Sequence, residues 1–208
     1  MSPSNLVRWS GFAGMVGGLL WLVLVPLTGY AWSHPIFGLS YEDYNRIMPV
    51  PRVLILASLI GFYVRHQGRS GRLDLAGFAV AVLGLTLMLA GGVVEFWLGG
   101  GARHGNEVLS SAGWNMVIAG VPTLYVGLML LGAATVRARV LAGWKRAAPL
   151  LVVAILPVTM ILDLVLRRGL GLKGPLISIT SFGLGWVLLG YALYRETNDL
   201  RPPGSSGS

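Results

Sequence analysis

The stretch Asp74–Leu98 reads DLAGFAVAVLGLTLMLAGGVVEFWL and has no charged side chain between Asp74 and Glu95. A bilayer has a hydrocarbon core of about 30 Å, which an α-helix of roughly 20 apolar residues can cross. The stretch is therefore predicted to be a transmembrane helix. Five further stretches share this character, so the predicted spans are residues 9–32, 49–65, 74–98, 112–136, 147–166 and 175–194.

The composition of the whole chain agrees with this prediction. Of its 208 residues 54% are hydrophobic and 12% are charged, whereas soluble domains carry about 25% charged residues. The connections between spans are short, which favours one domain over residues 1–200. We therefore expect an all-α integral membrane protein, a single bundle of six transmembrane helices. Residues 201–208 are rich in Pro, Gly and Ser and are expected to be a disordered tail or an expression remnant.

The basic residues predict how the chain crosses the membrane. A net charge of +8 in a soluble protein would suggest nucleic acid, but here the charges cluster between apolar runs, as the positive-inside rule describes. With both termini cytoplasmic, ten of the 16 Lys and Arg residues lie inside and six outside. The prediction is a multi-pass protein of the cell membrane without a nucleic-acid partner. Arg52, at the start of the second span, is expected to snorkel to the interface.

Small residues recur at helical spacing and predict tight helix packing. Gly77, Gly84, Gly91 and Glu95 follow one another at steps of seven, seven and four residues, which places them on one helix face. Glycine at such positions lets the backbones of neighbouring helices approach in a membrane. The same reasoning applies to Gly14 and Gly18 of the first span and to Gly113, Gly120 and Gly127 of the fourth. Kinks are expected at Pro26, Pro122 and Pro157.

Two acidic residues within apolar spans, Glu95 and Asp163, are the strongest functional candidates. A carboxylate at membrane depth is costly and usually faces a partner, a cavity or a pathway. Asp163 has Arg167 four residues on, so it either forms an ion pair within its helix or faces the bundle to bind a ligand. Asn115 could bond one of these acids across the bundle or cap its own helix. The candidate ligand-binding residues are Glu95, Asp163, Asn115, Arg167 and Arg168.

The sequence favours few kinds of chemistry. Without cysteine the chain has no thiolate metal site, and no lysine lies within a span to form a Schiff base. His34 and His104 are weak candidates for a metal site with the two acids, because no metal-ligand spacing connects them. No motif identifies catalytic residues, and no cofactor is predicted. A basic rim of Arg167, Arg168 and Lys173 would suit anionic lipid.

Three functions remain open from the sequence. The first is transport or binding of a small molecule, ion or lipid at an outward-facing site that contains Glu95 and Asp163. The second is an accessory or structural subunit, whose glycine faces bind a partner protein or a second copy of the chain. The third is a membrane enzyme that modifies a lipid. The opening residues 8–15 and the sequence Glu95-Phe96-Trp97 resemble those of small bacterial membrane proteins in general, which implies no activity.

Overall fold

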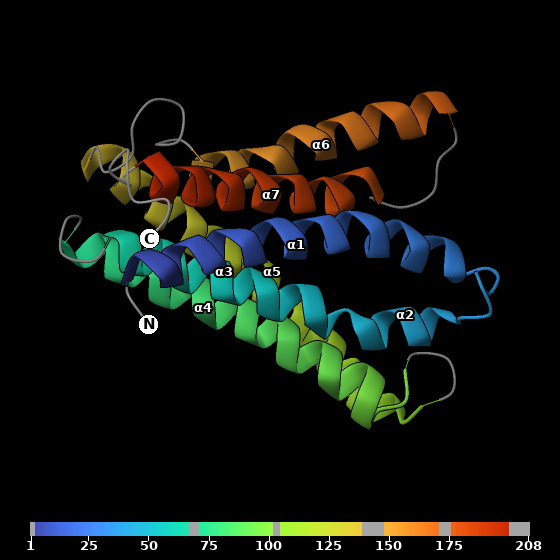
Figure 1. Cartoon of the computed structure of the whole chain (residues 1–208). Coiled ribbons are helices and arrows are strands. Elements are labelled where there is room, and N and C mark those ends of the chain that lie inside the picture. Colours follow the sequence, from blue (N-terminus) through green and yellow to red (C-terminus); the bar gives the residue numbers. More distant parts are fainter. Residues whose placement is uncertain (1–2, 67–70, 102–104, 139–147, 171–175, 200–208) are drawn as a thin grey trace, which may run out of the picture.

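The structure, a computed structural model, describes residues 3–66, 71–101, 105–138, 148–170 and 176–199. Within helices, only the backbone is described for residues 3–4, 66, 138, 156, 160, 163–170, 176–178 and 196–199. In these ranges the chain is helical and forms no strand (Figure 1). The helices are α1 (Pro3–Ala31), α2 (Tyr41–Ile47), α3 (Pro49–His66), α4 (Gly71–Val93), the π-helix η1 (Val94–Leu98), α5 (Glu107–Ala138), α6 (Ala148–Leu170) and α7 (Leu176–Asp199).

The six long helices of the described ranges close a ring. α4 packs on α5, α5 on α6, α6 on α7, α7 on α1, α1 on α3, and α3 again on α4. Successive long helices run in opposite directions, so α1 begins at the same end of the bundle at which α7 finishes (Figure 1). The short helix α2 and the turn from η1 to α5 lie at the opposite end. The prediction of an all-α protein is confirmed.

Four segments are long and apolar enough to cross a membrane. They are Asn5–Ala31, Tyr41–Arg65, Gly71–Leu98 and Glu107–Arg137. In α6 the described apolar part is shorter and covers Ala148–Thr159. These helices fit a membrane protein and correspond to the first four predicted spans. That α6 and α7 also cross, which would make six spans, stays a prediction.

The closest helix pair, α4 with α5, is built on two facing rows of glycine. Gly84 lies against the carbonyl of Gly120 and the backbone of Leu124, and a Cβ on Gly84 would collide with both. Gly91 lies in the same way against Gly113. The helices therefore touch backbone to backbone, which gains dispersion contact without a hydrophobic driving force. The packing role that the sequence predicted for these glycines is confirmed, and the two predicted rows face each other.

A second glycine contact joins α1 to α7. Gly18 lies against the carbonyl of Gly183, and Gly11 against that of Gly190. Trp21 of α1 and Trp186 of α7 belong to the apolar core of the bundle and are 4% and 0% exposed. α1 and α5 continue through Pro26 and Pro122. The α4–α5 pair and the α1–α7 pair are thus both packed through glycines, and the candidate site lies where the α4–α5 pair ends.

A cleft at the α2 end of the bundle

Glu95 belongs to a π-helical turn that ends the third long helix. The turn η1 covers Val94–Leu98, and the amide of Gly99 donates to the carbonyl of Val94, five residues earlier, at 2.7 Å. Such widened turns recur at functional sites because they redirect side chains away from the regular helix faces. Behind the turn, Gly113 of α5 lies against the backbone nitrogen of Glu95. The glycine row of α5 therefore fixes the position from which the Glu95 side chain leaves the helix.

The chain turns back after η1 through two glycines in the left-handed region. Gly100 has φ +78° and Gly101 has φ +93°, values that side chains disfavour. The turn is held by backbone bonds, of which the one from the Gly101 amide to the Glu95 carbonyl measures 2.9 Å. Asn106 then caps α5 by accepting from the Leu109 amide at 3.1 Å. Ser110 donates its hydroxyl to the carbonyl of Gly101 at 3.0 Å.

The short helix α2, which the sequence analysis did not predict, closes one side of this end. Ser40 and Asp43 form a capping box at its start. Arg46 donates from Nε to the carbonyl of Phe96 at 3.1 Å, and Trp97 of η1 donates to the carbonyl of Arg46 at 3.3 Å. This reciprocal pair of hydrogen bonds ties α2 to the π-helical turn. The Ser40-x-x-Asp43 spacing was the sequence signal that could have revealed the helix.

Arg52 does not snorkel to the interface, so that prediction is wrong. Its side chain is 7% exposed and turns into the bundle, where Nη1 donates to the carbonyl of Met88 at 2.5 Å. Gly92 provides the room, because any side chain there would collide with Nη1. A buried guanidinium needs both hydrogen bonds and an opposite charge. The opposite charge is Glu95, whose carboxylate and the Arg52 guanidinium attract each other.

The guanidinium of Arg52 and the carboxylate of Glu95 attract each other without forming a close ion pair. Among the described side chains, Arg46 with Asp43 at 3.5 Å is the one ion pair with nitrogen and oxygen within 4 Å. The Arg52 Nε atom is buried without a hydrogen-bond partner. No hydrogen bond within the described residues reaches the Glu95 carboxylate, although Glu95 is only 4% exposed. Its oxygens therefore remain available to a group that enters from the cleft.

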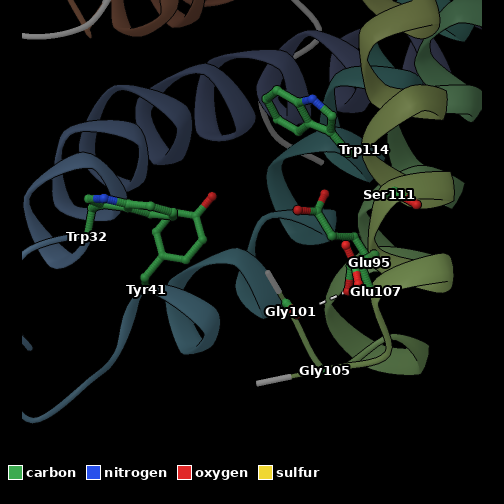
Figure 2. Close-up of a pocket in the computed structure, with 9 residues that line it drawn as sticks. Trp32, Tyr41, Glu95, Gly101, Gly105, Glu107, Ser111 and Trp114 are labelled. Carbon is green, nitrogen blue, oxygen red and sulfur yellow. Dashed lines mark hydrogen bonds between the residues drawn. The ribbon is translucent and has the colours of Figure 1, made fainter. Parts of the chain in front are cut away.

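Glu95 borders a partly open cleft of about 630 Å³, a size typical of small-molecule sites. Three aromatic side chains line it from separate elements: Trp32 after α1, Tyr41 of α2 and Trp114 of α5. Figure 2 shows the Glu95 carboxylate extending toward the space between Tyr41 and Trp114. The other described residues that line it are Gly101, Gly105, Glu107, Ser110 and Ser111. The cleft thus combines aromatic walls, carboxylates and hydroxyl groups.

Of the five predicted ligand-binding residues, Glu95 alone is seen to line this cleft. Asp163, Arg167 and Arg168 belong to α6, but their side chains lie outside the described part of the chain. Asn115 is exposed on α5 and is not among the residues that line the cleft. The partner seen for Glu95 is Arg52, which the sequence analysis placed at the interface.

Of the two weak metal candidates, His34 is the one that the structure describes. His34 is exposed and does not line the cleft, and His104 lies outside the described residues. Over the ranges that the structure describes, no three His, Asp or Glu side chains gather as metal ligands would. Trp32, Tyr41 and Trp114 were not predicted as site residues, because no local sequence pattern connects residues of three separate elements.

Comparisons with known proteins add no further assignment. Neither the family models, nor the curated proteins, nor the solved structures provide a match to this chain.

Proposed function

We propose that this protein binds a small ligand in the cleft beside Glu95, as the recognition step of transport or of sensing across the cell membrane. One observation carries the proposal: a carboxylate that is 4% exposed at the end of an apolar helix borders a cleft of about 630 Å³. An acid at such a position is costly and is expected to serve a ligand or pathway. The Arg52 guanidinium offsets part of the cost of burying the Glu95 charge by attraction at a distance. It does not donate a hydrogen bond to the carboxylate, whose oxygens remain available to a ligand.

The position of the cleft supports an outward-facing site. Its lining residues Tyr41, Glu95 and Glu107 belong to α2, η1 and the start of α5. These elements lie at the end of the bundle opposite the start of α1 and the end of α7 (Figure 1). The predicted orientation places that end outside. Trp32, Trp97 and Trp114 are 50%, 62% and 52% exposed there, as expected for aromatic residues at a membrane interface. A ligand would then reach Glu95 from the exterior or from the outer leaflet.

The test is a binding screen on the full chain in lipid nanodiscs. Thermal unfolding would be followed against a panel of organic cations, organic anions, sugars and lipids, and native mass spectrometry would detect molecules that purify with the protein. We expect at least one class to raise the unfolding temperature of the wild type and to lose this effect in Glu95→Gln. If no ligand class loses its effect on the unfolding temperature when Glu95, Trp32 or Trp114 is replaced, the cleft is not a binding site.

A matched control is Glu196→Gln near the end of α7, at the other end of the bundle. It makes the same chemical change at a site remote from the cleft. Ligand effects in this variant are expected to equal those of the wild type. If a ligand is found, uptake into proteoliposomes separates transport from sensing.

A further inference from the structure

The charges around the cleft point to the kind of ligand it takes. Glu95 borders the cleft, and Glu107 lines it at the start of α5. Glu42 of α2 is 8% exposed, its Oε1 atom has no hydrogen-bond partner, and its Cγ atom lies beside Gly101 of the cleft wall. Among the described side chains, Arg52 attracts the Glu95 carboxylate from the bundle interior, and Arg46 is paired with Asp43. The carboxylates of Glu95 and Glu107, which line the cleft, favour a cation as the ligand.

The aromatic walls narrow the choice of cation. The rings of Trp32 and Tyr41 meet edge to face with centroids 4.7 Å apart, and Tyr41 contacts Phe96 in the same way at 5.8 Å. Trp114 lies across the cleft on α5, and its indole is 52% exposed. Electron-rich ring faces attract organic cations, and several rings around one charge form the cage that binds quaternary ammonium groups. A bare metal ion would instead need several converging oxygen or nitrogen ligands.

Resting on the proposed function, we infer that the cleft binds an alkylammonium group, with the Glu95 carboxylate as its counter-charge and Trp32, Tyr41 and Trp114 as its aromatic wall. The cleft is far larger than an ion and fits a substituted ammonium together with part of the molecule that bears it. Two sources supply this chemistry: a soluble amine such as choline, and a phospholipid headgroup of the choline type. The partly open cleft, at the end of the bundle with the exposed tryptophans, is accessible to both.

The experiment measures binding of choline and tetramethylammonium to the full chain by isothermal titration calorimetry. The protein is held in phosphatidylglycerol nanodiscs, which contain no ammonium headgroup. The comparison ligand is 3,3-dimethylbutan-1-ol, the neutral counterpart of choline, and potassium chloride controls for ionic strength. We expect choline and tetramethylammonium to bind and the neutral alcohol to bind at least about tenfold more weakly, as loss of one charged interaction implies.

Variants assign the binding to the cleft. Glu95→Gln is expected to weaken choline binding by at least about tenfold, whereas Glu196→Gln should leave it unchanged. If Glu95→Gln does not fold, Trp32→Ala and Trp114→Ala take its place, because truncating these half-exposed rings spares the core. Each should weaken choline binding by about two- to thirtyfold, the range that cation–π contacts span, and should weaken binding of the neutral alcohol by a smaller factor, because only apolar contact is lost there.

A repeat in phosphatidylcholine nanodiscs distinguishes the two sources. If a lipid headgroup is the occupant, these nanodiscs suppress choline binding in the wild type; if a soluble amine is the occupant, the affinity is the same in both lipids. The inference is overturned if the neutral alcohol binds as tightly as choline, or if choline binds independently of Glu95, Trp32 and Trp114. If the thermal-unfolding screen finds a Glu95-dependent ligand that is not an ammonium compound, the ammonium inference is refuted but the binding site stands. If no ligand class shows an effect that depends on Glu95, Trp32 or Trp114, the binding site itself is refuted.

Discussion

The guanidinium of Arg52 fills the space that the missing side chain of Gly92 leaves open. A Cβ on Gly92 would meet Nη1 and Cζ of Arg52 and, its own helix aside, no other described atom within 4 Å. The neighbouring Gly91 serves another purpose, since it faces the backbone of α5. Two consecutive glycines thus separate two tasks: one brings the helices together, and the other admits the cation that balances Glu95.

Gly92→Ala is expected to destabilise the protein by about 1 kcal/mol. Alanine favours a helix over glycine by about 1 kcal/mol, but the added Cβ displaces Arg52 from the Met88 carbonyl, and a hydrogen bond to a charged group contributes about 1.5–3 kcal/mol. The measurement is the midpoint of unfolding in detergent with denaturant.

The Arg52→Ala background provides the control for this prediction. With the guanidinium removed, Gly92→Ala no longer meets any described side chain, so only the helix preference remains. The same substitution should then stabilise the protein by up to about 1 kcal/mol. If Gly92→Ala destabilises the protein in both backgrounds, the effect of Gly92 does not depend on Arg52.

Adding a methyl group to a glycine of the rows between α4 and α5 should destabilise the protein. Gly84→Ala brings a methyl group against the backbone of Leu124 and Gly120, and overpacking of this kind costs about 1–3 kcal/mol. Ala79→Val adds a larger group to the exposed face of the same helix and is expected to change stability by less than about 0.5 kcal/mol. Thermal unfolding of both variants compares the glycine face of α4 with its exposed face. An equal loss of stability in the two variants would contradict a close backbone contact at Gly84.

The turn after α1 holds Phe37 in a strained backbone conformation. Its φ is +52°, and its side chain is 88% exposed between Ile36 and Leu39, whose backbones exchange two hydrogen bonds of 3.0 Å. The left-handed region costs most L-residues about 1–2 kcal/mol but suits Asn. Phe37→Asn should therefore stabilise the protein by about 1 kcal/mol, measured by thermal unfolding. Phe37→Leu keeps the strain and should bring no such gain; an equal gain would show that strain is not the cause.

Single cysteines can test the predicted orientation, because the chain contains no native cysteine. Ser33 is exposed at the end of the bundle that holds α2, and Arg72 is exposed at the opposite end. On intact cells a membrane-impermeant maleimide should label Ser33→Cys, whereas Arg72→Cys should react only after lysis. The opposite pattern would reverse the topology and place the cleft inside the cell.

Local sequence patterns predicted the features that residues close together in the chain control by themselves. Apolar length predicted the helices, since a chain in lipid must satisfy its backbone hydrogen bonds within each segment. Heptad spacing predicted that Gly84 and Gly120 lie on packing faces, because helix geometry fixes which residues share a face. The depth of Glu95 within an apolar run made it a candidate functional residue. Each of these inferences depends on neighbours within about two helical turns.

What only the tertiary structure decided is which side chains meet Glu95. Arg52 lies 43 positions earlier in the chain and reaches the bundle interior because α3 packs on α4 beside Gly92; its position at the start of a span indicated the interface instead. The cleft likewise joins Trp32, Tyr41 and Trp114 from three elements. Periodicity determines the direction of a side chain on its own helix, but the neighbour it meets depends on how the helices pack. By itself, then, the sequence determined the helices and the acid, while their packing decided its counter-charge and its aromatic surroundings.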